Sequence, residues 1–228
     1  MPEGRTDAPR GARIARLAGL YALTPDVDDT AVLAAQVAAA LAGGASAIQY
    51  RNKPASHPLR REQARVLAKV CAARGALFIV NDDVDIAREV GADGVHIGED
   101  DGGIARARST LGGDRLIGVS CYNEWERAQA AVDAGADYVA FGSFFPSATK
   151  PRARRAQLEL LRRAAPLPVP VVAIGGITSA NAKALIDAGA AAVAVIGDVF
   201  AHDELPEIER AAAAIAALFA KPDSSERS

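Results

Sequence analysis

The sequence lacks the features that mark secreted, membrane-spanning or nucleic-acid-binding proteins. Its 228 residues include only two cysteines, Cys71 and Cys121, which are too few for a disulfide framework and have no metal-ligand spacing. Charged residues interrupt every alanine-rich segment, so no stretch approaches the roughly 20 apolar residues that a membrane span requires. The net charge of −2 leaves no broad basic surface for nucleic acid. We therefore expect a cytoplasmic protein with neither a membrane nor a nucleic-acid partner.

The two ends of the chain differ in composition from the rest. Residues 1–16 carry four arginines with Pro and Gly but no apolar run of the secretory type. Residues 221–228 read KPDSSERS, a composition typical of a disordered end. We predict a flexible N-terminal extension over 1–16, a catalytic domain over 17–220 and a disordered tail over 221–228.

A repeat runs through the predicted domain. Alanine-rich segments with helical periodicity end at Gly-Ala, and a short apolar run follows, as expected where a helix closes at glycine and leads into a buried strand. The runs do not alternate with polar residues, which favours parallel strands covered on both faces. Such runs lie at 20–23, 47–50, 77–80, 94–97, 116–119, 138–141, 171–174 and 193–196. Predicted helices lie at 29–42, 58–73, 83–90, 102–111, 123–133, 155–164, 179–188 and 205–219.

This alternation without an interdomain linker predicts an α/β protein with a single (β/α)8 TIM barrel. The length also allows two small domains, but no linker divides the chain, and an open doubly wound sheet is the remaining alternative.

Charged side chains follow several of the predicted strands. In a TIM barrel the chemistry gathers at the carboxyl ends of the strands, where the loops begin. Arg51, Lys53 and Lys150 place three cations at those positions. Each cation taken alone is also explained as a solvent-exposed residue at the edge of the barrel. Their gathering at one end of the barrel, however, indicates an anionic substrate.

Two carboxylates accompany these cations. Asp82 and Asp101 follow the third and fourth predicted strands. So small a set of oxygen ligands suits Mg²⁺, which keeps few protein ligands when phosphates complete its coordination. We predict Mg²⁺ as the cofactor, held by Asp82 and Asp101. Cations beside a carboxylate-held metal indicate a diphosphate, whereas acids alone would suit a sugar and cations alone a monophosphate.

A second anion site is predicted after the last two strands. Gly175-Gly176 follows the seventh run, and Ile196-Gly197-Asp198 follows the eighth. Glycines leave backbone N–H groups accessible, and these two loops form the usual phosphate site of such barrels. The expected partners are therefore phosphorylated small molecules, while the oligomeric state is left open.

Seven segments in order, over about residues 19 to 200, resemble motifs of the thiamine-phosphate synthase family. They are QYRNK (49–53), NDDVDIA (81–87), GVHIGEDD (94–101), GVS (118–120), FGSFFPSATKP (141–151), VAIGGI (172–177) and VAVIGDVF (193–200). The resemblance implies a transferase of thiamine biosynthesis. Such an enzyme joins 4-amino-2-methyl-5-(diphosphooxymethyl)pyrimidine to thiazole phosphate, carboxylated or not, and releases diphosphate.

The resemblance also implies roles for individual residues. Four residues are expected to act in catalysis: Arg51, Lys53, Ser120 and Lys150. The side of the site that takes the pyrimidine diphosphate is expected to include Gln49, Tyr50, Arg51, Asn52, Lys53, Asn81, Ser120 and Lys150. The thiazole phosphate site is expected to include Ser147, Thr149, Gly176, Ile196 and Gly197.

The chain departs from the family pattern at three positions. Glu99 stands in place of a frequent Gln, Ser147 in place of a common Thr, and Gly197 where a Ser commonly helps to hold the thiazole phosphate. Loss of one hydroxyl contact at Gly197 would weaken binding by about 1–3 kcal/mol. His96 lies within a matched segment, either as a site residue or as a histidine bonded to a loop.

Two other functions remain as alternatives. A thiazole tautomerase-like barrel would handle only the thiazole ring and would not need both QYRNK and NDD. A non-catalytic barrel that binds phosphorylated ligands and regulates the pathway would not need Asp82, Asp101 and Lys150 together.

Overall fold

Eight parallel strands close into a barrel in the computed structural model, which describes residues 8–98, 102–146 and 155–220. Strands pair in chain order, and β8 pairs with β1 to close the barrel. The prediction of a single TIM barrel is confirmed, and the predicted tail at 221–228 lies outside the described residues. The strands are β1 (Gly19–Leu23), β2 (Ala45–Tyr50), β3 (Leu77–Asn81), β4 (Gly94–Ile97), β5 (Leu116–Tyr122), β6 (Tyr138–Gly142), β7 (Val171–Ile174) and β8 (Ala192–Val195).

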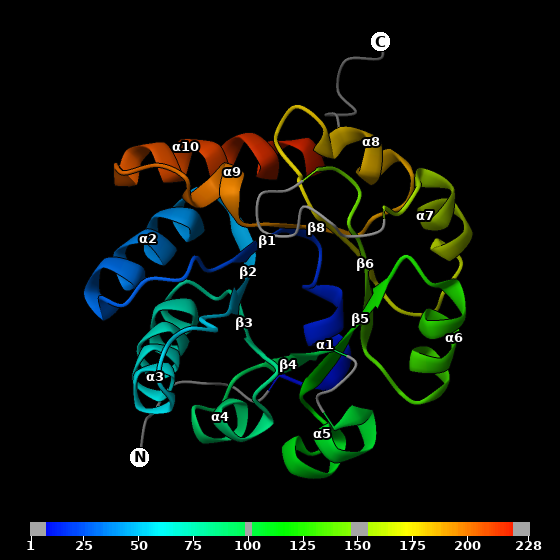
Figure 1. Ribbon diagram of the computed structural model, residues 1–228, viewed down its shortest axis with the longest axis horizontal. Helices are drawn as coiled ribbons and strands as arrows, with labels where there is room; N and C mark the ends of the chain where they lie inside the picture. Colours follow the sequence, from blue (N-terminus) through cyan, green and yellow to red (C-terminus); the bar gives the residue numbers. More distant parts are fainter. Residues whose placement is uncertain (1–7, 99–101, 147–154, 221–228) are drawn as a thin grey trace.

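Helices surround the strands as a ring (Figure 1). In the described ranges, no helix is both long enough and apolar enough to cross a membrane. The helices are α1 (Arg10–Ala15), α2 (Thr30–Ala42), α3 (His57–Ala73), α4 (Val84–Glu89), α5 (Gly103–Leu111), α6 (Trp125–Asp133), α7 (Leu158–Ala164), α8 (Ala182–Asp187), α9 (Gly197–Phe200) and α10 (Leu205–Ala216), followed by a 3₁₀ turn (Ala217–Phe219).

Short polar side chains begin the helices that follow the first three strands. Asp29 accepts hydrogen bonds from the N–H groups of Ala31 and Val32 at the start of α2. Asp83 accepts the N–H of Ile86 at the start of α4, over a distance of 2.9 Å. These caps satisfy N–H groups that have no partner within the helix, and they place each helix start beside the end of the preceding strand.

The strands separate two apolar layers. Side chains such as Leu23, Leu77 and Val172 fill the interior of the barrel, while Ile48, Phe78 and others pack between the strands and the helices. Successive residues of a strand point to opposite faces, so each strand contributes to both layers. The same alternation decides which polar side chains near the strand ends face the mouth of the barrel.

Helix α1 closes the amino end of the barrel, in contrast to the predicted flexible extension over residues 1–16. Arg13 is 2% exposed, and its Nε lies 3.1 Å from Oδ1 of Asp93. Leu17 is buried in the inner apolar layer, and Ile14 packs against that layer. The prediction was wrong for residues 10–16 because the acid that holds Arg13 stands 80 positions away in the sequence.

Candidate active site

The end of β2 divides the QYRNK segment between two environments. Tyr50 is 2% exposed and donates its hydroxyl to Oε1 of Gln63 on α3 at 2.8 Å. Asn52 is 3% exposed and donates its amide to the same oxygen at 3.1 Å and to the carbonyl of Val27 at 3.0 Å. Tyr50 and Asn52 were predicted to bind substrate, but both side chains take the helix-facing side of the alternation and are covered there, away from the mouth of the barrel.

The two described cations of the site each face a carboxylate. Nη1 of Arg51 lies 3.1 Å from Oδ1 of Asp26, and Nζ of Lys53 lies 3.5 Å from Oδ2 of Asp82. All four side chains are at least one-fifth exposed, so water screens both pairs and each contributes little stability. A polyanionic ligand can therefore compete for both cations at small cost. The third predicted cation, Lys150, lies outside the described residues.

Asp26 is a charged neighbour of the site that the sequence analysis missed. It follows β1 closely, and Thr24 beside it ties β1 to β2, with its Oγ1 2.9 Å from both the N–H and the carbonyl of Arg51. An acid two residues after a threonine at a strand end was the available signal.

Asp82 stands at the end of β3 in an unusual backbone conformation. Its φ is +63°, in the left-handed region that residues other than glycine rarely adopt. Two contacts of the backbone require this turn. The N–H of Asp82 donates to the carbonyl of His96 on β4 at 2.8 Å, and the next residue, Asp83, caps α4. The turn leaves the Asp82 carboxylate one-third exposed and near Lys53.

A hollow of about 310 Å³ adjoins this carboxylate. It is lined by Asp82, Asp83, Val84 and Asp85 with His57 and Arg106. Asp83 is engaged with α4 and Arg60, and Asp85 with Arg88 and Arg106. Of the acids that line this hollow, Asp82 is therefore the one whose carboxylate also lies beside Lys53, which is predicted to bind substrate.

The described donors at the rim of the barrel suit a magnesium ion that has few protein ligands. Among residues 8–98, 102–146 and 155–220, no three His, Cys, Asp or Glu side chains are grouped as a metal site. A single exposed carboxylate oxygen pair at Asp82 has the hard-oxygen chemistry of Mg²⁺, which takes one or two protein carboxylates when substrate phosphates supply the remaining oxygens. Asp82, the described member of the predicted pair of ligands, therefore fits a magnesium ion. Asp101, the other member, lies outside the described residues.

A chain of hydrogen bonds crosses the floor of the barrel mouth. Nε2 of Gln49 donates to the hydroxyl of Tyr21 at 2.9 Å, and that hydroxyl lies 2.9 Å from the hydroxyl of Tyr138. The Tyr138 hydroxyl lies 3.1 Å from Nδ1 of His96, whose Nε2 lies 2.9 Å from Oγ of Ser120. The chain thus connects two predicted substrate contacts, Gln49 on β2 and Ser120 on β5, through three side chains of the interior.

Tyr21 and Tyr138 were not identified from the sequence. Both lie within apolar strand runs, and both occupy the inner face together with Leu23 and Ala140. A phenol on the inner face of a barrel strand needs a polar partner for its hydroxyl, which was the available signal. Burial raises the pKa of both phenols above the usual value near 10. They therefore stay protonated across the physiological range.

Ser120 is also held through its backbone. Nε of Arg127 on α6 donates to the carbonyl of Ser120 at 2.8 Å, and its guanidinium lies 5.2 Å from the ring centre of Tyr122. Cys121 between them is buried, and this burial raises the pKa of its thiol to about 12. A thiol protonated at neutral pH is a poor nucleophile, so the structure offers no catalytic role for Cys121.

The loops after β7 and β8 are tied together. The N–H of Ser179 donates to Oδ2 of Asp198 at 2.9 Å, and Asn181 bonds the N–H of Thr178 and the carbonyl of Gly176. Gly176 has a φ of +63°, and a Cβ there would lie 2.2 Å from the carbonyl oxygen of Pro146. Only glycine fits that position.

Gly197 differs from Gly176 in its surroundings. No described atom lies within 4 Å of a Cβ built there. Within the described residues, neither the Gly176 N–H nor the Gly197 N–H has a recorded acceptor. Ile196 packs against the inner apolar layer beside them. The predicted contacts Ser147 and Thr149 lie outside the described residues.

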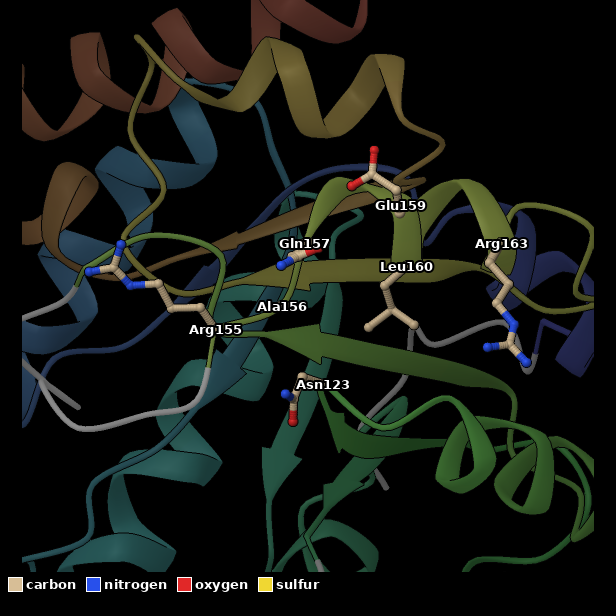
Figure 2. Close-up of a pocket in the computed structure, with 7 residues that line it drawn as sticks. All are labelled: Asn123, Arg155, Ala156, Gln157, Glu159, Leu160 and Arg163. Carbon is tan, nitrogen blue, oxygen red and sulfur yellow. The ribbon is translucent and has the colours of Figure 1, made fainter.

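A second hollow, of about 340 Å³, lies between the end of β5 and α7 (Figure 2). Asn123 lines one side, and 155–157 with Glu159, Leu160 and Arg163 line the other. Figure 2 shows Arg155 and Arg163 pointing away from each other, and Arg163 stacks 4.4 Å from the ring centre of Trp125. Because its two cations do not converge, this hollow is not arranged to hold one anion.

Comparison with known proteins agrees with this geometry. The family described as thiamine monophosphate synthase matches residues 20–199. A thiamine-phosphate synthase of Chromobacterium violaceum is 56% identical over 198 residues, which cover 87% of this chain and 96% of that protein. One of Azoarcus sp. is 56% identical over 207 residues, which cover 90% and 98%.

A solved structure is similar as well. Thiamine phosphate pyrophosphorylase from Pyrococcus furiosus superposes with a TM-score of 0.79 at 35% identity, and the match covers 90% of this chain and 96% of that one.

Proposed function

The chain belongs to the thiamine monophosphate synthase family and is a thiamine-phosphate synthase, a transferase, and on this premise we propose how its residues carry out the reaction. The substrates are the pyrimidine methyl diphosphate and thiazole phosphate, and they meet at the carboxyl end of the barrel. The observation that carries the proposal is the Lys53–Asp82 pair. In this pair a lysine predicted to bind substrate lies 3.5 Å from a carboxylate predicted to bind Mg²⁺, at the rim of the barrel.

The diphosphate binds to the cations of the rim. Arg51 and Lys53 exchange their partners Asp26 and Asp82 for phosphate oxygens, and Lys150 adds a third positive charge. This exchange is supported by the exposure of both pairs, since an exposed ion pair contributes only about 0–1 kcal/mol. A guanidinium can bind two phosphate oxygens at once, which orients the leaving group.

Magnesium is held by Asp82 and Asp101 in this proposal. When bound, the ion supplies positive charge to the diphosphate as that group leaves. The carboxylate of Asp82 lies where Lys53 also reaches, so this acid serves both the metal ion and the lysine. The hollow beside Asp82 supports the proposal because it gives a ligand access to that carboxylate.

Gln49, Asn81 and Ser120 contact the pyrimidine or its leaving group. Gln49 and Ser120 both belong to the hydrogen-bonded floor, so neither side chain is free to turn. Asn81 ends β3 in register with His96 of β4, next to that floor. The thiazole phosphate binds at Gly176, Ile196 and Gly197, together with Ser147 and Thr149. This is supported by the N–H groups of Gly176 and Gly197, for which the described residues record no acceptor.

The chemical step needs no covalent bond to the protein. The bond between the pyrimidine methylene carbon and the diphosphate oxygen breaks, and its electron pair leaves with the oxygen. The lone pair of the thiazole nitrogen then forms the new carbon–nitrogen bond. With the uncarboxylated thiazole phosphate this step transfers no proton, so positioning of the two substrates and stabilisation of the leaving charge supply the rate enhancement.

The direct test mixes the purified protein with both substrates and Mg²⁺ and measures thiamine phosphate and diphosphate. Equal amounts of the two products support the proposal. Binding of both substrates by the folded protein without any product would instead indicate a regulator, and conversion of the thiazole substrate alone would indicate a tautomerase. We further propose a cytoplasmic location, which is supported by two buried cysteines without a disulfide.

A further inference from the structure

The hydrogen bonds that join the five side chains on the barrel floor all run in one direction. The number of protons that these side chains carry decides that direction. Each phenol keeps one hydroxyl proton, and a neutral imidazole keeps one N–H proton. Gln49 donates to the Tyr21 hydroxyl through Nε2 at 2.9 Å, so the Tyr21 oxygen accepts there. In the described part of the chain, the acceptor recorded for the Tyr21 proton is then the Tyr138 hydroxyl, at 2.9 Å.

The same argument extends along the chain to β4. Because Tyr138 accepts from Tyr21, it gives its own proton to Nδ1 of His96, at 3.1 Å. Nδ1 is therefore the acceptor nitrogen, and the imidazole proton belongs on Nε2. Nε2 donates to Oγ of Ser120 at 2.9 Å. The proton of the Ser120 hydroxyl is then not used within the chain.

Packing holds the central groups in place. The Tyr138 and His96 rings are stacked, with their centres 5.5 Å apart and a 28° angle between their planes. The Tyr21 ring meets Tyr138 edge to face, at 6.2 Å and 71°. Tyr21 and Tyr138 are at most 1% exposed and His96 is 7% exposed. Water therefore has little access to replace a partner, and reversing one hydrogen bond requires reversing the others.

We propose that Tyr138 holds His96 as the Nε2–H tautomer and that His96 thereby acts as a positioning residue, which leaves the Ser120 hydroxyl proton available to the departing diphosphate. This inference rests on the proposed function of Ser120. A hydroxyl already directed at the leaving oxygen stabilises the developing negative charge without having to reorient during the reaction. In the reversed chain, Ser120 would spend its proton on His96 and would present only an acceptor to the substrate.

The tautomer can be measured directly in the intact wild-type protein. Nitrogen-15 NMR of protein labelled at histidine distinguishes Nε2–H from Nδ1–H, and His57→Gln with His202→Gln removes the signals of the other two histidines. The expected result is a proton on Nε2 and none on Nδ1. A proton on Nδ1, alone as in the reversed chain or together with one on Nε2, would overturn the proposal, whatever the enzyme activity.

The link to Ser120 is tested by a double-mutant cycle. Tyr138→Phe removes the proton that Nδ1 accepts, so we expect kcat to fall roughly 3- to 10-fold with both KM values within about twofold of wild type. In a Ser120→Ala background, the same change should have little further effect on kcat. If the two fold-losses in kcat instead multiply in the double variant, the proposal is overturned, because Tyr138 would then act without Ser120.

Ser46→Ala is the control. Ser46 also donates one side-chain hydroxyl, to the carbonyl of Leu20 at 3.1 Å, but it lies near the start of β2, and its replacement should leave kcat and KM unchanged. A wild-type kcat in Ser120→Ala would overturn the proposed role of Ser120 itself, which the tautomer measurement distinguishes from failure of the chain. If Tyr138→Phe does not fold, the NMR of the wild-type protein still decides the tautomer.

Discussion

The ring of Tyr138 covers the backbone of Gly118 so closely that a Cβ on Gly118 would lie 1.9 Å from Cζ of Tyr138. The two residues are register partners on β5 and β6. The glycine of the GVS segment therefore provides the space in which the Tyr138 ring lies, and through it the floor chain reaches Ser120.

Gly118→Ala should displace the Tyr138 ring and break its bonds to Tyr21 and His96. We expect a loss of about 1–3 kcal/mol in the free energy of unfolding, as for other overpacked cores, and a fall in kcat of about tenfold or more. Denaturant unfolding and steady-state kinetics measure the two effects. Gly113→Ala is the control, because no atom of the described residues lies within 4 Å of its added Cβ. Wild-type kinetics in Gly118→Ala would show that the position of Tyr138 does not matter.

Asp82→Asn should reduce activity by about two to three orders of magnitude, if the carboxylate holds the ion that stabilises the leaving diphosphate. The Mg²⁺ concentration for half-maximal rate should rise as well. Asp85→Asn tests the same hollow with an acid that instead pairs with Arg88 and Arg106, and it should leave both values unchanged. An unaltered magnesium dependence in Asp82→Asn would remove the proposed metal role.

Gly197→Ser should lower the KM for thiazole phosphate. No described atom lies within 4 Å of the added Cβ, so the fold should be unaffected, and one new hydroxyl contact of about 1 kcal/mol corresponds to roughly a fivefold change. Gly176→Ser is a contrasting variant, since its Cβ would collide with Pro146 and activity should be lost. An unchanged thiazole phosphate KM in Gly197→Ser would argue against a phosphate contact at this position.

Arg13→Ala should destabilise the protein without reducing kcat in the folded enzyme. The change leaves the nearly buried Asp93 without its arginine, at a cost of about 3–5 kcal/mol in the free energy of unfolding. Arg162→Ala removes an exposed partner of Glu159 and should cost less than about 1 kcal/mol. Urea unfolding compares the two variants. Equal small losses would mean that α1 contributes little to closing the barrel.

Tyrosine ionisation should coincide with alkaline unfolding. Burial raises the pKa of Tyr21, Tyr50 and Tyr138 above their unfolded value near 10. Above that pH the unfolded chain binds fewer protons than the folded one. The contribution of these phenols to the free energy of unfolding is therefore fully present below pH 10 and is lost as the pH rises further. Absorbance at 295 nm and circular dichroism should change together. Two or more phenols ionising in a still-folded protein would contradict this, because Tyr122 is the one phenol of the four whose side chain is exposed.

Much of the fold could be predicted because each strand is a local signal. The apolar runs coincide with all eight strands within three residues at each end, since unbroken apolar runs between glycine-closed helices have few other uses in a chain of this size. The short helix α1 was missed because Arg13 has a distant partner, Asp93. No local pattern can show that a polar side chain will be buried against a residue 80 positions away.

The site was predicted in kind more than in detail. The sequence by itself determined which residues stand at the ends of the strands, because the order of runs and loops follows from local periodicity. Only the tertiary structure decided which of them face the mouth of the barrel: Tyr50 and Asn52 turn to α3, while Tyr21 and Tyr138 turn inward and join Gln49 to His96. The reason is geometric, because closure of the barrel sets which face of each strand points inward, and it brings together side chains that are more than 100 positions apart in the sequence.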